Sequence, residues 1–307
     1  MCSVHRKGYL MSKNNNLITA KKNKKDEFYT QIEDIEKELS HYKEQLKGKV
    51  IYCNCDDPNN SEFWNYFKEN FDKLELEKLV ATSYGETEVS YKTEYDGKYV
   101  IETPLNQNGD FRNTENIEIL KESDILITNP PFSLFREYIA QLTHYNKKFI
   151  IIGSQNAVTY NEVFSLLKEN KIWLGYRSGS YKFEIPEDYI TGNIITEDAK
   201  RYVKLGNITW YTNIDTTKRK EELVLFHNYN EIDYPTYDNY NAINVNKVKE
   251  IPCDYYGAMG VPITFMDRYN PSQFEILGQT GVDIKLNKGR PYINGKRLYA
   301  RILVKRK

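Results

Sequence analysis

Apolar positions in the first 170 residues follow two different spacings. In residues 31–47 they recur every three or four positions, from Ile32 to Tyr42, which is the spacing of one face of an α-helix. Residues 124–128 and 148–153 are short, continuously apolar runs, as in strands that are buried on both faces. The same reasoning predicts strands over 49–55 and 76–82, a hairpin over 89–103, and helices over 61–71, 133–145 and 161–170.

Strands and helices therefore alternate up to residue 170. Such alternation predicts an α/β protein with a mostly parallel central sheet and helices on both faces of that sheet. Beyond residue 170 the pattern changes to short strands and loops. Residues 1–24 are polar and rich in asparagine and lysine, so we expect a flexible segment there.

Charge is unevenly distributed, although 43 basic and 43 acidic residues give no net charge. Residues 285–307 carry nine cations and no acid: Lys285, Lys288, Arg290, Lys296, Arg297, Arg301, Lys305, Arg306 and Lys307. Because these cations alternate with apolar residues, we expect a strand in which Arg297, Arg301 and Lys305 share one exposed face. Such a face would suit a phosphate backbone, whereas a solvated tail is the alternative interpretation.

The cysteines and the hydropathy of the chain argue against several classes of protein. Cys2, Cys53, Cys55 and Cys253 form no disulfide framework, and no Cys/His pair follows at the spacing of a zinc finger, so we expect no metal. We find no signal peptide and no apolar run of membrane length, so we expect a cytoplasmic protein that contacts no membrane.

The sharpest chemical signal is the segment Asn129-Pro130-Pro131-Phe132, directly after the predicted strand 124–128. Ligands bind at the carboxyl ends of the strands in open parallel sheets. The prolines fix the backbone, and the Asn129 side chain adds a carbonyl acceptor. Two rigid acceptors suit an aromatic amino group that donates two hydrogen bonds, because such bonds favour a pyramidal nitrogen with an available lone pair. Phe132 offers a stacking face for a flipped base. The alternative interpretation is purely structural: a proline turn that only ends the strand.

Asn-Pro-Pro-Phe is the motif of the amino-methyltransferases of DNA, and the chain resembles the EcoRI-type adenine-specific DNA methyltransferases from about residue 25 to its end. Family-like segments are Asp26-Glu27-Phe28-Tyr29-Thr30-Gln31, residues 207–215, residues 251–255 and Gly260-Val261-Pro262-Ile263-Thr264-Phe265. The resemblance implies a Rossmann-like fold dependent on S-adenosylmethionine, with a C-terminal target-recognition extension. It implies methylation of the N6 amino group of a flipped adenine in duplex DNA, in restriction-modification or in host or phage DNA protection.

The resemblance also assigns roles to particular residues. Phe28, Tyr29 and Thr30 would hold the methionine end of the cofactor, and Asn129 would contact both cofactor and target. Asp57 would accept from the amino group of the cofactor's methionine, and Asp110 from the amino group of its adenine. Taken singly, either aspartate is an ordinary helix cap or turn residue.

Two features depart from the usual pattern of such enzymes. The loop Asp57-Pro58-Asn59-Asn60 contains no glycine, and we expect Asn59 or Asn60 to adopt the left-handed conformation instead. The second predicted strand is followed by Ser83-Tyr84 rather than by an acid for the ribose. Cofactor binding is therefore less strongly indicated than catalysis.

The domain organisation that follows has a methyltransferase core over 25–175, and remaining core strands with the DNA-recognition region over 176–307. Residues 175–180, which include Arg177, and residues 257–264 are interpreted as polar loops that contact DNA, or else as ordinary surface loops. We expect a monomer, and any companion restriction endonuclease would act separately. The rival hypotheses are methylation of adenine in RNA, methylation of glutamine in a protein, and a DNA-binding homologue that has no catalytic activity.

Overall fold

A computed structural model describes residues 28–85, 89–187, 189–190, 192–281 and 288–307. The segment 1–24, for which flexibility is expected, lies outside the described residues, as does Lys285.

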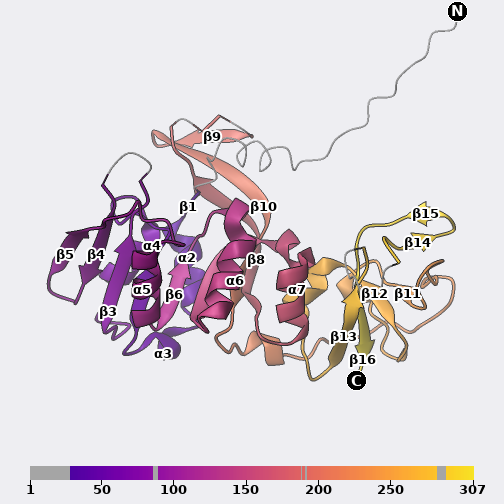
Figure 1. The fold of residues 1–307 in the computed structure, drawn as a ribbon. Coiled ribbons are helices and arrows are strands. Elements are labelled where there is room, and N and C mark those ends of the chain that lie inside the picture. Colours follow the sequence, from indigo (N-terminus) through magenta and orange to yellow (C-terminus); the bar gives the residue numbers. More distant parts are fainter. Residues whose placement is uncertain (1–27, 86–88, 188, 191, 282–287) are drawn as a thin grey trace, which may run out of the picture.

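Ten strands of the described chain form one sheet. They are β1 (Tyr29–Thr30), β2 (Val50–Cys53), β3 (Lys78–Thr82), β4 (Tyr91–Tyr95), β5 (Val100–Pro104), β6 (Ile125–Thr128), β7 (Lys148–Ser154), β8 (Trp173–Glu184), β9 (Ile194–Glu197) and β10 (Lys200–Thr212). Their order is β1-β8-β10-β7-β6-β2-β3-β4-β5, and β9 pairs with β10 (Figure 1). The four central strands β7, β6, β2 and β3 are parallel, whereas the flanking pairs are antiparallel. The α/β class is confirmed, but parallel pairing is confined to the centre of the sheet.

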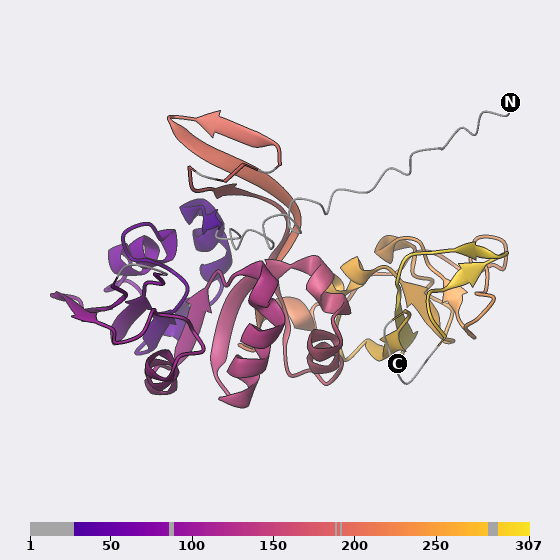
Figure 2. The same ribbon diagram turned by 45° about the horizontal axis from the view of Figure 1, so that its top comes forward.

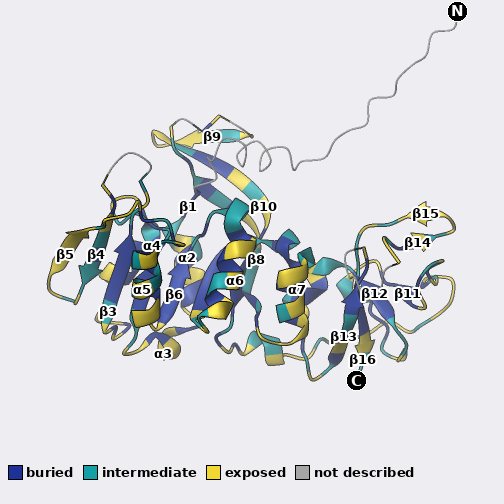
Figure 3. Ribbon diagram, viewed as in Figure 1, coloured by how far each residue is buried: buried dark blue, intermediate teal, exposed yellow. Residues whose placement is uncertain are grey.

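The two faces of the sheet are covered by different helices. Alternate side chains of each central strand enter different clusters: Tyr52 and Leu126 enter one, and Ile51 and Ile125 the other. The first cluster contains the apolar sides of α5 (Thr114–Glu122), α6 (Phe135–His144) and α7 (Asn161–Lys168). The second contains those of α2 (Ile32–Leu39), α3 (Lys43–Leu46) and α4 (Glu62–Glu69). Central strands buried on both faces, visible in Figure 3, explain why their sequences read as continuous apolar runs.

Several local features follow the sequence closely. Ser61 caps α4 by accepting from the backbone N–H of Phe63. The β4–β5 hairpin turns at Asp96-Gly97, where Gly97 has a φ of +91°. The expected helix over 31–47 is divided into α2 and α3. Between them, the hydroxyl of Tyr42 donates to the buried carboxylate of Glu38 at 2.9 Å.

The expectation of short strands after residue 170 is confirmed for β9 and for the strands beyond residue 242, but it is wrong for residues 173–184 and 200–212. β8 and β10 are the longest strands described, and with β9 they project from the rest of the molecule (Figure 2). Residues 175–180 lie within β8 and form no loop. The expected domain boundary at residue 175 therefore falls inside a strand of the main sheet.

β8 contains a bulge that is held by a buried carboxylate on one side and a partly buried ammonium group on the other. Residues 175–177 lie opposite the single residue Trp210, between the pairs Thr209–Ser178 and Tyr211–Leu174. Glu38, which is 0% exposed, accepts from the backbone N–H groups of Tyr176 and Arg177, each at 2.8 Å. A Cβ at Gly175 would lie 2.2 Å from the Glu38 carboxylate, so only glycine fits there.

Lys218 holds the carbonyl groups of the same bulge. Its ammonium donates to the carbonyls of Gly175 and Tyr176 at 2.9 and 2.8 Å, and it pairs with Asp267 at 2.7 Å. Lys218 lies in the 3₁₀ turn η3 (Lys218–Lys220), and Asp267 lies in η5 (Ile263–Arg268). The bulge therefore connects α2 to the C-terminal part of the chain.

The C-terminal unit, residues 221–281 and 288–307, is built on a second sheet. Its strands are β11 (Ile243–Asn244), β12 (Met259–Val261), β16 (Ile302–Arg306) and β13 (Phe274–Gln279), in that order. β14 (Tyr292–Ile293) and β15 (Lys296–Arg297) form a separate hairpin. The remaining 3₁₀ turns are η1 (Phe132–Leu134), η2 (Gln155–Thr159) and η4 (Val248–Glu250). One continuous cluster joins the buried side chains of α6 and α7 to Phe265, Phe274 and Ile302 of this unit.

The single basic strand expected near the C-terminus is wrong. Arg297 lies in β15 and Lys305 in β16, which belong to different sheets. Both residues are exposed, whereas Arg301 is half-buried with its Nε 3.4 Å from the side-chain oxygen of Asn244. Leu303, on the same face of β16 as Lys305, is buried in a small cluster with Tyr237, Tyr240 and Ala242.

The buried Glu38 generates a prediction about pH. Burial raises its pKa to about 7, although bonds from Tyr176, Tyr42 and Arg177 and the charge of Lys218 act in the opposite direction. Because the folded pKa exceeds the unfolded one, the stability that this group contributes is complete at low pH and is lost as the pH rises through 7. In chemical unfolding at a series of pH values, Glu38→Gln should remove a fall of roughly 3 kcal/mol in the unfolding free energy between pH 4.5 and 8.

The control for this experiment is Glu36→Gln, an exposed carboxylate on the same helix. Its pH profile should match that of the unmodified protein. The interpretation of Glu38 fails if the profiles of the two variants coincide.

Candidate active site

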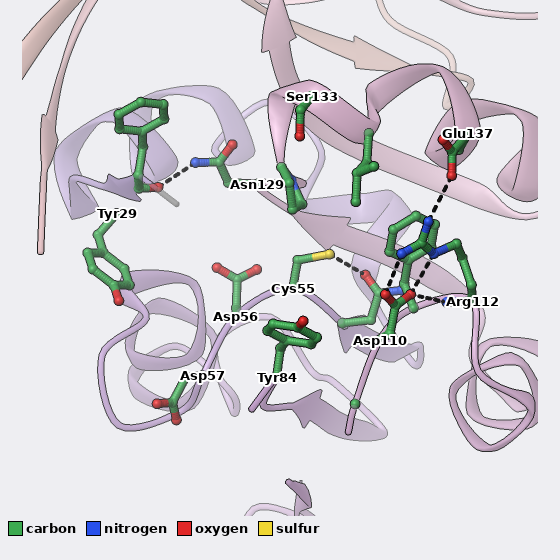
Figure 4. A pocket seen from close by; sticks show the side chains of 16 residues that line it. Tyr29, Cys55, Asp56, Asp57, Tyr84, Asp110, Arg112, Asn129, Ser133 and Glu137 are labelled. Atoms are coloured by element: carbon green, nitrogen blue, oxygen red, sulfur yellow. Dashed lines mark hydrogen bonds and ion pairs between the residues drawn. The ribbon is translucent and has the colours of Figure 1, made fainter. Parts of the chain in front are cut away.

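A cavity of about 600 Å³ opens at the carboxyl edge of the central strands. β2, β3 and β6 are parallel, so the residues that follow them meet at this edge. The residues that line this main cavity are Phe28, Tyr29, Asn54, Cys55, Asp56, Asp57, Tyr84, Gly109, Asp110, Phe111, Arg112, Asn129, Pro131, Ser133, Leu134 and Glu137 (Figure 4). The structure thus brings together Asp57, Asp110 and Asn129, as the sequence predicted.

Asn129 is held in one orientation at the wall of the cavity. Its side-chain N–H₂ donates to the backbone carbonyl of Phe28 at 2.6 Å, which fixes the amide because a carbonyl can only accept. Its Oδ1 is buried and has no hydrogen-bond partner among the residues that the structure describes. Pro130 is buried, and the carbonyl of Pro131 accepts from the N–H of Leu134 at 3.0 Å. The site therefore presents one oriented, unsatisfied amide oxygen.

Phe132 lies outside the main cavity. Its ring packs against Phe28 and Phe183, with centroids 5.8 and 6.3 Å away, and remains half-buried. Among the three residues expected to hold the cofactor, Phe28 and Tyr29 line the cavity. Thr30 is buried, pairs with Phe183 across β1 and β8, and is absent from the cavity wall.

The loop without glycine is organised by Asp57. One carboxylate oxygen accepts from the backbone N–H and the side-chain amide of Asn59 at 3.0 and 3.1 Å, and the other from the amide of Asn60 at 3.1 Å. Neither asparagine has a positive φ, so the expected left-handed substitute for glycine is wrong. Asp56, which sequence reasoning missed, is buried and accepts from the hydroxyls of Ser61 (2.9 Å) and Thr128.

Asp110 is paired on the opposite side of the cavity. Arg112 bonds to it through Nη2 at 2.6 Å and Nε at 2.9 Å, and through Nη1 to Glu137 at 3.0 Å. The Arg112 side-chain hydrogen bonds hold the pKa of Asp110 below its usual range against the effect of burial. Arg112, Glu137 and Tyr84 were missed, since the first two meet only in the folded chain. The sole signal was that Tyr84 follows the second strand where an acid is usual.

Gly109 allows the chain to pass close to the loop after β3. Its φ is +73°, and a Cβ would lie 1.9 Å from the backbone oxygen of Ser83. Glycine is therefore required both for conformation and for space, directly before Asp110.

The residues expected to bind DNA do not line the main cavity. Arg177 lies in the β8 bulge, where it pairs with Asp34 at 3.5 Å and lies 5.8 Å from the ring of Tyr181. Arg297, Arg301 and Lys305 belong to the C-terminal unit. Within the described ranges, no three His, Cys, Asp or Glu side chains are grouped to hold a metal, and no helix is long and apolar enough to cross a membrane.

A parallel core, a cavity at its carboxyl edge and an Asn-Pro-Pro-Phe turn in the cavity wall define a methyltransferase of Rossmann-like fold. The chain belongs to the family described as adenine-specific methyltransferase EcoRI, whose family model matches residues 16–307.

Three relatives support this assignment. The chain is 48% identical to the type II methyltransferase M.EcoRI of Escherichia coli, over 95% of this chain and 96% of that protein. It is 41% identical to M.MgeORF184P of Mycoplasma genitalium and 38% identical to M.MpnI of Mycoplasma pneumoniae, in each case over 94% of this chain and 97% of the relative. The fold class and the family expected from the sequence are confirmed.

The close approach at Gly109 generates a prediction. Gly109→Ala should lower the unfolding free energy by more than about 1 kcal/mol, because a left-handed alanine is strained and its Cβ meets Ser83. It should also weaken binding of the methyl donor, because the family resemblance assigns donor binding to the next residue, Asp110. Denaturant unfolding and calorimetry would measure these effects. Gly206→Ala is the matched control, because a Cβ there meets nothing within 4 Å. Equal stability of the two variants would contradict the prediction.

Proposed function

We propose that this chain transfers a methyl group from S-adenosylmethionine to the exocyclic N6 amino group of an adenine flipped out of duplex DNA. The observation that carries the proposal is the buried Oδ1 of Asn129, which lacks a partner while its amide nitrogen is bonded to Phe28. A buried acceptor without a partner costs about 1–3 kcal/mol, so a ligand that donates to this oxygen would recover that energy.

An adenine amino group is a fitting ligand for this oxygen. It has two N–H donors, of which Asn129 would accept one. The Pro131 carbonyl already accepts from the backbone N–H of Leu134. We therefore assign the second N–H of the adenine amino group to the carbonyl of Pro130. Two such bonds favour a pyramidal nitrogen, which returns the lone pair from the ring to the amine. In this proposal Phe132 stacks on the target base from its half-exposed side.

The main cavity suits the charge and shape of S-adenosylmethionine, which supplies an electrophilic methyl group when bound. Four carboxylates and one arginine line it: Asp56, Asp57, Asp110, Glu137 and Arg112. A mainly acidic wall complements a ligand with ammonium and sulfonium charges. Asp57 would accept from the ammonium group and Asp110 from the amino group of the cofactor's adenine, since each carboxylate oxygen has two lone pairs. Tyr29, Tyr84 and Phe111 add aromatic surface.

Duplex DNA is the proposed partner, with exposed Arg297 and Lys305 as phosphate contacts. Arg301 and Arg177 remain proposed contacts, but their guanidinium groups are already engaged by Asn244 and Asp34. A monomer and a separately acting companion nuclease also belong to this proposal, as does a role in restriction-modification, which M.EcoRI suggests by its description as a type II methyltransferase.

In the decisive experiment, the enzyme is incubated with S-adenosylmethionine that carries a labelled methyl group. Duplex DNA, RNA or a protein is supplied as the substrate. Label should enter adenine of duplex DNA, and sequencing of modified bases would give the recognition site. Label in RNA or protein alone would contradict the proposed substrate, and label nowhere would favour the hypothesis of a homologue without catalytic activity.

Asn129→Ala tests the catalytic role of the unpartnered oxygen. We expect the single-turnover methylation rate to fall by roughly 100-fold or more, as when one oriented polar group at a reaction centre is removed. Donor affinity and duplex affinity should stay close to those of the unmodified enzyme, so that the effect appears in kcat. Asn65→Ala, on the exposed side of α4, is the control. An Asn129→Ala enzyme with an ordinary single-turnover rate would refute the assignment.

The double replacement Arg297→Gln with Lys305→Gln tests the basic C-terminal unit. Duplex affinity should fall for all sequences alike, and the salt dependence should become shallower by about 0.9 for each phosphate that is no longer neutralised. The control is Lys47→Gln with Lys73→Gln, two exposed lysines at the opposite edge of the main sheet. If the salt dependence of the first variant is unchanged, these cations face solvent when DNA is bound.

A further inference from the structure

Arg136 is an oriented cation at the carboxyl edge of the central strands, near the Asn129 turn. It is exposed in the first turn of α6, and its guanidinium carbon lies 4.1 Å from the centre of the Tyr160 ring. Tyr160 directly precedes α7. Stacking on an aromatic face fixes the plane of a guanidinium and leaves the N–H groups along its edge available.

No carboxylate neutralises Arg136 within the part of the chain that the structure describes: it forms no ion pair and no hydrogen bond there. Its neighbour Glu137 pairs with Arg112 instead, at 3.0 Å. Arg112 and Arg136 thus both lie at the carboxyl edge of the central strands, but they differ in their ion pairing. Arg112 is bonded to Asp110 and Glu137, whereas Arg136 has only the stacking contact.

The order of the strands places Arg136 and Tyr160 beside the target site and apart from the main cavity. β6, which is followed directly by Asn129, has β2 on one side and β7 on the other. From Asn129 the main cavity extends towards β2 and β3, because Asp57 follows β2 and Tyr84 follows β3. Tyr160 follows β7 and η2, on the other side of Asn129. The start of α6 serves both sides, since Glu137 faces the cavity and Arg136 faces Tyr160.

We propose that Arg136, stacked on Tyr160, binds a phosphodiester of the DNA strand that carries the target adenine. This inference rests on the proposed function. A base that reaches Asn129 has left the duplex, so its own sugar-phosphate must pass along the rim beside the turn. The edge of a guanidinium matches two phosphate oxygens, and no internal acid among the described residues competes for it. The contact positions the strand without reading its sequence.

Arg136→Gln tests the charge. Duplex affinity should fall roughly tenfold, as expected when a charge-assisted hydrogen bond is removed, and the salt dependence should become shallower by about 0.9. Binding of S-adenosylmethionine alone should be unchanged. Lys73→Gln removes one exposed charge from the opposite edge and should alter neither quantity. Tyr160→Phe should behave as the unmodified protein, and Tyr160→Leu should bind duplex more weakly because the guanidinium is no longer held.

Single uncharged methylphosphonates, scanned along the target strand, locate the contact. With the unmodified protein, one or two positions beside the adenine should weaken binding about tenfold, and Arg136→Gln should be insensitive at those same positions. Identical scans for the two proteins, together with an unchanged salt dependence, would overturn the proposal. An unmodified protein that methylates no duplex would instead contradict the proposed function, so the two failures are distinguishable.

Discussion

The buried carboxylate of Glu38 is the interaction on which the arrangement of the molecule depends. At the β8 bulge, Glu38 accepts the backbone N–H groups that have no partner in a neighbouring strand. Lys218 donates to the backbone carbonyls of the same bulge. Because α2 follows β1 directly, anchoring α2 also places the Phe28 carbonyl that orients Asn129. Lys218 extends the same connection to Asp267, which also accepts from the hydroxyl of Ser178 at 2.7 Å. The Asn129 amide and the C-terminal unit are therefore both connected to the same segment of β8.

This arrangement explains why a charged group is buried in a core that apolar side chains could fill. The β8 bulge leaves N–H and C=O groups without ladder partners, and buried backbone groups must be satisfied. A carboxylate that accepts two backbone N–H bonds and one hydroxyl satisfies the N–H side, although desolvation raises its pKa to about 7. Beyond the bulge β8 continues to its pairing with β1, where Phe183 packs against Phe132 of the Asn129 turn.

The sequence predicts the central strands well because their burial on both faces depends on local composition. The Asn129 motif and the aspartates that follow strands are readable for a similar reason, since parallel strands gather their carboxyl ends. β8 and β10 are not readable, because glycines interrupt them and because the β8 bulge is satisfied by Glu38. That residue lies 138 positions before Tyr176, a separation that no local pattern records. The prediction of a single basic strand near the C-terminus is wrong for another reason. Asn294 and Gly295, both with positive φ, turn the chain between β14 and β15, so β15 belongs to a hairpin separate from β16.

The zero net charge of the chain conceals a separation that the proposed reaction needs. The methyl donor is cationic and the DNA strand is anionic, yet both must approach Asn129. Strand order separates most of these charges, because Asp56 and Asp57 follow β2, whereas Arg136 faces Tyr160, which follows β7. Glu137, the cavity acid next to Arg136 in the sequence, pairs with Arg112, and Arg136 forms no ion pair among the described residues. Because exposed charges are screened over about 8 Å at physiological ionic strength, each ligand responds mainly to the charges nearest to it.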